Sequence, residues 1–189
     1  MSCVDIIDWI FSTKKPEDIF ILSNGHAALA QYVILEKYYN IDAEMLYLKH
    51  GSHPHLDEEN HIYCSTGSLG MGISAAVGRS VAKPNRTIHV MLSDGESAEG
   101  IVWESLRFIA DNPVPNMKMY FVHNGYGAYC EIPFIDFQRR VGAFSNNENI
   151  CIIKDGQIPI EEFPFLRGQN AHYKIMNEDD YKVAMELLK

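Results

Sequence analysis

The segment from residue 93 to residue 126 constrains the fold more than any other part of this 189-residue chain. An apolar run at 87–92 precedes it, and it contains an amphipathic stretch at 98–111 and a second apolar run at 117–122. Short apolar runs with β-branched residues are typical of buried strands, and the stretch between them has its apolar residues at helical spacing. The sequence therefore predicts a β-α-β unit, and with it an α/β fold built on a mostly parallel sheet.

This unit places Asp94 after its first strand and Asn124 after its second. A right-handed crossover carries the carboxyl ends of both strands to one edge of the sheet, where open α/β sheets bind their ligands. A carboxylate and an amide oxygen suit Mg²⁺, which takes most of its other ligands from phosphate and water. Gly95 lets the chain turn tightly and approach a phosphate closely. We therefore expect a site for magnesium and a phosphorylated ligand at this edge.

Length and composition exclude several classes of function. A chain of 189 residues with 47% hydrophobic residues can bury the core of one domain, which we expect to span residues 1–189. The net charge of -9 argues against a nucleic acid partner and against an anionic membrane surface. The four cysteines have no zinc-site spacing, and no apolar run reaches membrane length. Together with a start that has no export signal, these features favour a cytoplasmic protein with reduced thiols.

The spacing of the polar residues resembles the thiamine diphosphate motif, a Gly-Asp-Gly followed about thirty residues later by an Asn. Asp94 and Gly95 match its first part and Asn124 its last, with Ser93 in place of the first glycine. The alternative for residues 93–95 is an ordinary turn, since Asp-Gly is a common turn dipeptide. The resemblance implies that Asp94, Asn124 and the backbone carbonyl of Tyr126 hold Mg²⁺, and that Gly95 contacts the cofactor.

Two segments with histidines resemble the transketolase family. Residues 18–27 resemble its strand leading into Leu-Ser-x-Gly-His-Ala, which implies that His26 lies over the cofactor diphosphate and the reactive centre. Residues 52–54 stand at its Gly-His-Pro, which implies that His53 hydrogen-bonds the substrate. The alternatives are a capping or core histidine at position 26, and a solvated loop or a metal site in the histidine-rich stretch 49–61.

A glycine-rich stretch at 65–72 precedes a small-residue segment that we expect to be a buried helix. Bare backbone N–H groups at the start of a helix can bind an anion, although small residues also simply allow close packing. The stretch resembles the family's Thr-Thr-Gly-Pro-Leu-Gly-Gln-Gly, with Ser68 and Met71 in place of proline and glutamine. The resemblance implies that Gly67 and Leu69 contact the aminopyrimidine end of the cofactor.

The rest of the chain matches the family less closely. Glu99 matches a glutamate near the cofactor at the subunit contact, although an exposed glutamate at a helix start is the alternative. His172 matches a late active-site histidine, or is an ordinary surface residue. We expect one further strand at 149–154 and a last helix at 181–188. Relative to the family, the chain looks shortened at its N-terminus and in its C-terminal half, where we expect at least one sheet-covering helix to be absent.

The resemblance implies a three-layer α/β/α fold and the chemistry of a transketolase. Such an enzyme uses thiamine diphosphate and Mg²⁺ to move a two-carbon ketol unit from a ketose or its phosphate to an aldose. The acid that activates the aminopyrimidine belongs to a separate pyrimidine-binding domain, so this chain would be the diphosphate-binding subunit of a split enzyme, in a heterotetramer with a pyrimidine-domain subunit. The alternatives are the α subunit of a 2-oxo-acid dehydrogenase and a degenerate, non-catalytic subunit.

Overall fold

The computed structural model describes residues 3–127, 130–144, 149–154, 163, 165 and 174–187. The chain divides into two compact units, Cys3–Lys154 and Asp155–Lys189. The first unit contains the sheet, and the second contains the helix α7 (Glu178–Leu187). A single domain over residues 1–189 therefore stays a prediction, whereas the last helix is present and begins three residues earlier than expected.

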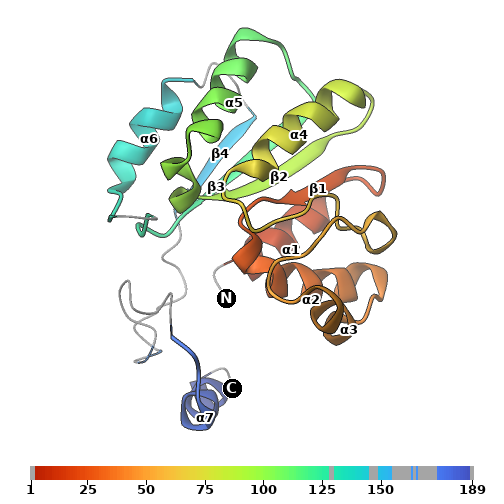
Figure 1. Cartoon of the computed structure of the whole chain (residues 1–189), viewed down its shortest axis with the longest axis vertical. Helices are drawn as coiled ribbons and strands as arrows, with labels where there is room; N and C mark the ends of the chain where they lie inside the picture. The colour runs from red at the N-terminus through yellow and green to blue at the C-terminus, as the bar shows by residue number, and fades with distance from the viewer. Residues whose placement is uncertain are drawn as a thin grey trace. The chain divides into compact units, whose positions relative to one another are not determined.

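The first unit is built on a parallel sheet in the order β1-β2-β3-β4, as Figure 1 shows. Its strands are β1 (Ile19–Leu22), β2 (Ile88–Ser93), β3 (Met117–His123) and β4 (Ile150–Lys154). The register pairs Ser93 with Val122, so β2 and β3 end side by side. All four predicted strands are confirmed, and the segments that follow β1, β2 and β3 meet at one edge of the sheet.

One face of the sheet is covered by α4 (Met71–Ala82), α5 (Gly100–Asp111) and α6 (Phe134–Gly142) (Figure 1). Alternate residues of the strands point into this layer, as expected for strands that are buried on both faces. The core here joins strand residues such as Val90 and Phe121 to Leu106 of α5 and Phe137 of α6. This packing fixes the start of α5 close to the end of β2.

The opposite face is covered by α1 (Val4–Thr13) and α2 (Ala28–Tyr39), with α3 (Ala43–His50) packed beside α2. The second core joins Phe20 and Met91 of the strands to Ile10 of α1 and Leu35 of α2. Helices on both faces of a parallel sheet make the three-layer α/β/α architecture that the sequence analysis expects. Within the part of the chain that the structure describes, no helix is long and apolar enough to cross a membrane.

Two helices were not predicted from the sequence. α3 begins at the cap residue Asp42, whose side chain accepts a hydrogen bond from the Met45 N–H at 2.9 Å. α6 lies between β3 and β4 and buries Phe137 and Val141 against the sheet. The interval between β3 and β4 therefore supplies one helix to the sheet cover, and the expected absence of a further covering helix stays a prediction.

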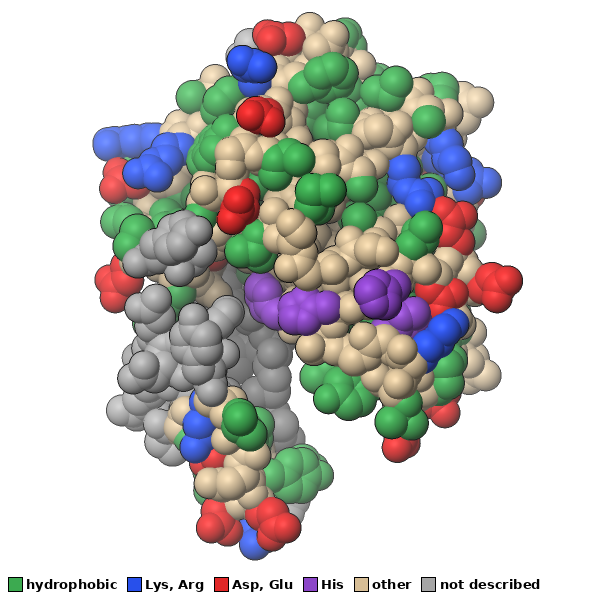
Figure 2. All heavy atoms as spheres, viewed as in Figure 1, with side chains coloured by type: hydrophobic (Ala, Val, Ile, Leu, Met, Phe, Trp, Pro, Cys, Tyr) green, Lys and Arg blue, Asp and Glu red, His purple; other side chains and the backbone are tan. Residues whose placement is uncertain are grey.

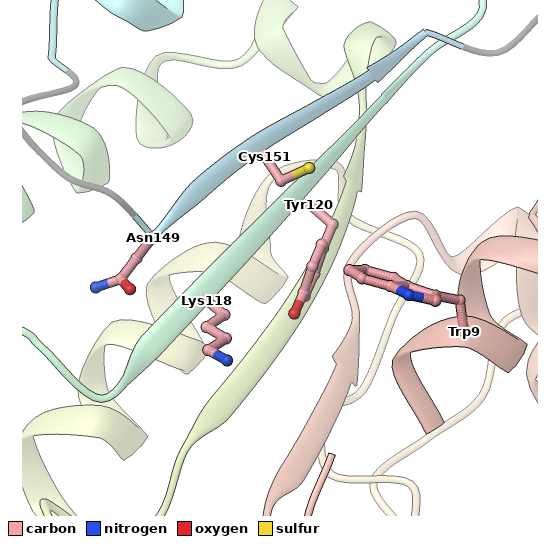
Figure 3. A pocket seen from close by; sticks show the side chains of 5 residues that line it. All are labelled: Trp9, Lys118, Tyr120, Asn149 and Cys151. Carbon is pink, nitrogen blue, oxygen red and sulfur yellow. The ribbon is translucent and has the colours of Figure 1, made fainter. Parts of the chain in front are cut away.

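A shallow pocket of about 190 Å³ lies on the α1 side of the sheet, beside the first half of β3 (Figure 3). The Tyr120 ring meets the Trp9 ring edge-on, with the ring centres 5.8 Å apart, and the Tyr120 hydroxyl lies 3.0 Å from Nδ1 of the buried His89. The remaining lining residues are Lys118, Asn149 and Cys151. None of them lies at the carboxyl ends of the strands, so this pocket is separate from the site described next.

Candidate functional site

The structure brings Asp94 and the residue after Asn124 into direct contact. Asp94 opens η3 (Asp94–Ala98), a short 3-10 helix directly after β2, and its Oδ2 accepts a hydrogen bond from the Gly125 N–H at 2.8 Å. Its other oxygen accepts from its neighbour Gly95 at 3.0 Å. The two ends predicted to meet at the sheet edge are therefore hydrogen-bonded to each other.

Asp94 is a fully buried carboxylate. Burial raises the pKa of Asp94 above its usual range, while the hydrogen bond from Gly125 and the nearby imidazole of His123 oppose that rise. His123 Nε2 lies 3.8 Å from Asp94 Oδ2 and 2.7 Å from the carbonyl oxygen of Ile132. A buried carboxylate with a raised pKa gains stability from a nearby cation, as expected for a metal ligand.

The loop after β3 offers further oxygen ligands. Asn124 is exposed, and its Oδ1 accepts a hydrogen bond from the Tyr126 N–H at 2.9 Å across Gly125, which has a positive φ of 88°. Among the described residues, no group of three or more His, Cys, Asp or Glu side chains could hold a metal ion. An ion here would therefore depend on one carboxylate, one amide oxygen and a backbone carbonyl. That small set of hard oxygen donors fits Mg²⁺ that is also bound to phosphate.

The segments that carry His26 and His53 meet around Gly25. A Cβ atom on Gly25 would lie 2.5 Å from Oγ1 of Thr66 and 3.1 Å from Cδ2 of His53, so this position has no room for a side chain. The backbone of Thr66 donates to the carbonyl of Pro54 at 2.9 Å, which joins the His53 loop to the glycine-rich stretch. Three blocks that the sequence analysis singled out separately are therefore in contact.

His26 is exposed within η1 (Gly25–Ala27), a short 3-10 helix that leads into α2. Gly67 is exposed and has a φ of +109°, and a Cβ atom there would lie 3.9 Å from Cβ of His53. Leu69 is half-buried. A backbone in the left-handed region is suited to glycine, so the conformation of this loop depends on Gly67.

Glu96 joins these segments, a role that was not predicted from the sequence. Its side chain is fully buried, and it accepts hydrogen bonds from the Ser23 hydroxyl, the Gly70 N–H and the Ser93 N–H. Burial raises the pKa of Glu96, while the hydrogen bonds from these groups oppose that rise. Ser93 and Glu96 also form a capping box, a pattern that could have been recognised as Ser-x-x-Glu. The serine in place of the family glycine therefore has a local structural role.

Glu99 is half-buried at the start of α5 and makes no hydrogen bond to cap the helix. A Cβ atom on Gly70 would lie 3.3 Å from Cβ of Glu99, so Glu99 lies beside the glycine-rich stretch. The side chain of Glu99 is therefore partly shielded from solvent, unlike that of an exposed glutamate at a helix start. The remaining predicted site residue, His172, lies outside the residues that the structure describes.

The histidine-rich stretch is held together by Asp57. Its carboxylate lies 2.9 Å from Nε2 of His50 and accepts from Nζ of Lys49 at 2.7 Å and from Nδ2 of Asn60 at 2.8 Å. Burial alone would raise the pKa of Asp57, but these bonds outweigh burial and hold it well below its usual range. His61 stacks on Tyr39, with the ring centres 3.9 Å apart.

These contacts distinguish His53 from the other histidines of the stretch. Histidine side chains gather in a band across the face shown in Figure 2. His50 and His61 have structural partners, and His55 is exposed. His53, in contrast, lies against Gly25 and Gly67. The stretch is therefore a folded loop in which His53 is exposed and lies beside Gly25 and Gly67, and its role stays a prediction.

Comparisons with known proteins agree with this geometry. The family model described as "Transketolase, thiamine diphosphate binding domain" matches residues 12–128, more than half of the chain. The chain belongs to the transketolase family. Rat transketolase is 34% identical to it over 170 residues, which cover 82% of this chain and 26% of the rat protein. The chain thus spans about a quarter of the length of the curated transketolases that it matches.

Transketolase from Campylobacter jejuni has the same fold, with a TM-score of 0.72 and 18% identity over 96% of this chain and 37% of that one. The "6-deoxy-6-sulfo-D-fructose transketolase subunit SqwG" of Clostridium sp. (strain MSTE9) is 34% identical over 118 residues, which cover 57% of this chain and 42% of that protein. The family, the three-layer fold and the thiamine diphosphate-binding domain are therefore confirmed.

Proposed function

We propose that this chain is the diphosphate-binding subunit of a thiamine diphosphate- and Mg²⁺-dependent transketolase-like enzyme. With a partner subunit, it would transfer a two-carbon ketol unit from a ketose or ketose phosphate to an aldose acceptor. The observation that carries this proposal is the Asp94–Gly125 hydrogen bond, which assembles the metal side of the site within the region that matches the family model.

In this proposal, Mg²⁺ is held by Asp94, by the side chain of Asn124 and by the backbone carbonyl of Tyr126. We assign Gly95 to the diphosphate, because it directly follows Asp94 in the turn after β2 and a glycine lets the backbone approach a phosphate closely. Gly67 and Leu69 line the aminopyrimidine end. The fit is supported by the buried carboxylate with its raised pKa and by the small number of hard oxygen donors beside it.

Thiamine diphosphate, when bound, supplies the nucleophilic carbon and the electron sink for breaking the bond next to a ketose carbonyl. The chain's own part is to orient the reactants and to move protons. Imidazole side chains can donate and accept protons at neutral pH, so we assign proton transfers with sugar hydroxyls to His26, His53 and His172. The proximity of His53 to Gly25 and Gly67 supports its place beside the residues proposed to meet the cofactor, where it would meet the substrate.

The partner would be a subunit with a pyrimidine-binding domain, in a heterotetramer. One observation supports this part of the proposal: a relative that is 34% identical over 118 residues is itself named a transketolase subunit. The partner would supply the acid that activates the aminopyrimidine, and Glu99 would lie at the contact between the subunits.

The test is a titration of thiamine diphosphate and Mg²⁺ into the purified chain, alone and with a pyrimidine-domain subunit, followed by assays with ketose phosphates. We expect weak binding and no turnover by the chain alone, and tight binding with turnover by the pair. Turnover of a ketose phosphate by the chain alone would refute the split enzyme. Turnover of a pyruvate-like acid, with none of ketose phosphates, would instead identify a 2-oxo-acid dehydrogenase subunit, and inactivity with every partner would identify a degenerate subunit.

A further inference from the structure

We infer that Glu96 is a positioning residue that locks the metal-side turn and the glycine-rich loop into one unit; this inference rests on the proposed function. The positions proposed to meet the two ends of the cofactor come from separate parts of the chain. Asp94 and Gly95 follow β2, whereas Gly67 and Leu69 precede α4. A cofactor that spans both needs them at a fixed separation, and Glu96 is the side chain that connects them.

The connection consists of three hydrogen bonds to one carboxylate. Oε1 of Glu96 accepts from the Ser23 hydroxyl and from the Gly70 N–H, the latter at 2.9 Å. Oε2 accepts from the Ser93 N–H at 2.9 Å. Ser23 follows β1 and lies 73 residues away from Glu96 in the sequence. Gly70 precedes α4 and lies 26 residues away, and Ser93 ends β2. A single side chain therefore ties three segments of the candidate site.

Tight packing around these donors leaves the glycine-rich loop little freedom to adjust. A Cβ atom on Gly72 would overlap the side chain of Ser23, and a Cβ atom on Gly70 would lie 2.8 Å from Cγ2 of Ile101 in α5. Residues 70–72 are thus packed tightly between the end of β1 and the start of α5. A change in the hydrogen bonds of Glu96 will therefore be transmitted to the backbone of residues 67–70.

A buried carboxylate is a costly way to stabilise a fold. Removing a charged group from water costs free energy, and well-packed apolar side chains often replace buried polar groups without loss of stability. At position 96, however, an apolar side chain would leave the buried N–H groups of Gly70 and Ser93 without their acceptor. A carboxylate with three donors is suited to fixing geometry, and this is the role that we assign to Glu96.

The test compares Glu96→Gln with Glu104→Gln, which removes the same charge from an exposed position on α5. Gln keeps the shape but replaces one acceptor oxygen with an NH₂ group, so the bond from the Ser93 N–H or the bond from the Gly70 N–H must fail. Hydrogen exchange of the backbone amides is measured first, without cofactor. We expect the amides of Ser93 and of residues 67–72 to exchange about tenfold faster in Glu96→Gln, with the amides of β3 and the control variant unchanged.

The second measurement is thiamine diphosphate affinity in the presence of Mg²⁺ and the partner subunit, well below the unfolding temperature. We expect Glu96→Gln to weaken binding by roughly tenfold or more relative to Glu104→Gln at a temperature where both variants are fully folded, although the lost hydrogen bond also lowers its unfolding midpoint. A merely structural role would lower the midpoint and leave the affinity of the folded protein unchanged. Unchanged loop exchange, or unchanged affinity, would overturn the inference.

Two further variants keep the result interpretable. Ser23→Ala removes one donor to the same carboxylate, so it should accelerate exchange in the same loop even if Glu96→Gln does not fold. Asp94→Ala tests the proposed function in the same titration. Loss of binding by Asp94→Ala with full binding by Glu96→Gln would overturn this inference alone, whereas absence of binding by the parent protein would overturn both.

Discussion

The carboxylate of Asp94 accepts a hydrogen bond from the backbone N–H of Gly125 at 2.8 Å, between the ends of β2 and β3. Because Gly125 directly follows Asn124, this bond makes the two proposed metal ligands one structural unit. The His123 imidazole behind it is held by the carbonyl of Ile132, which fixes the other side of the loop. Substitutions of Asp94 or Asn124 should therefore lower cofactor affinity more than they lower the stability of the fold.

Asp94→Ala should lower the affinity for thiamine diphosphate and Mg²⁺ by roughly 100-fold or more, because it removes the single carboxylate of the proposed site. The fold should persist, since the substitution also removes a buried carboxylate whose ionised form is disfavoured. Calorimetric titration and thermal unfolding would check the two statements. Asp111→Ala, at an exposed position, is the charge-matched control. Unchanged affinity in folded Asp94→Ala would reject this metal ligand.

Asn124→Ala should weaken cofactor binding by only about tenfold, because it removes a neutral ligand. It also removes the acceptor for the Tyr126 N–H, so the carbonyl proposed as the third ligand should lose part of its orientation. The same titration, repeated at several Mg²⁺ concentrations, would show a partial loss that high Mg²⁺ restores. A loss as large as that of Asp94→Ala would contradict this ranking.

His53→Ala should reduce turnover roughly 100-fold while leaving thiamine diphosphate affinity nearly unchanged, since proton transfer affects the reaction rather than the diphosphate contacts. His55→Ala is the matched control, because His55 is an exposed histidine of the same loop. Steady-state kinetics of the two-subunit enzyme would provide the comparison. Equal turnover in His53→Ala and the parent would show that His53 is an ordinary residue of a solvated loop.

Gly72→Ala and Gly78→Ala should have opposite effects on stability, although both lie in α4. A Cβ atom on Gly72 would overlap Ser23, so we expect a loss of about 1–3 kcal/mol together with a displaced glycine-rich loop. Nothing lies within 4 Å of the corresponding atom on Gly78, so alanine there should stabilise the helix by about 0.5–1 kcal/mol. Urea unfolding would measure both, and equal effects would contradict the packing described here.

Stability should fall as the pH is lowered from about 6.5 to about 4, because of His89. Burial lowers the pKa of this imidazole from 6.5 to about 4, although the carboxylate of Asp18, 3.5 Å away, opposes the shift. In this window the unfolded chain binds a proton that native His89 does not, so acid favours unfolding. The full effect is about 2–4 kcal/mol.

Urea unfolding at a series of pH values would test this prediction. His89→Gln should be less stable at neutral pH, because it loses the contact with the Tyr120 hydroxyl, but its stability should change less between pH 6.5 and pH 4. The exposed His55 is the control, and His55→Gln should retain the slope of the parent protein. A slope as steep in His89→Gln as in the parent would exclude His89 as the cause.

The sheet and its main helices could be predicted because their sequences carry strong apolar patterns. Of the two missed helices, α3 lacks such a pattern and buries Leu46 alone. α6 has apolar residues at helical spacing, but it has only 9 residues and buries only Phe137 and Val141. Short helices owe their stability to tertiary packing, which local sequence does not reveal. Glu96 escaped notice for a similar reason, because two of its donors, Ser23 and Gly70, lie far away in the sequence.

The loop that carries His53 is ordered by contacts outside the proposed reaction site. Asp57 gathers Lys49, His50 and Asn60 at one end, and Thr66 bonds to the carbonyl of Pro54 at the other. Fixing a backbone costs about 1–2 kcal/mol of conformational entropy per residue. Here that entropy is lost when the chain folds, before any ligand arrives. A sugar bound as proposed would therefore meet His53 already in place, and more of the contact free energy would remain as affinity.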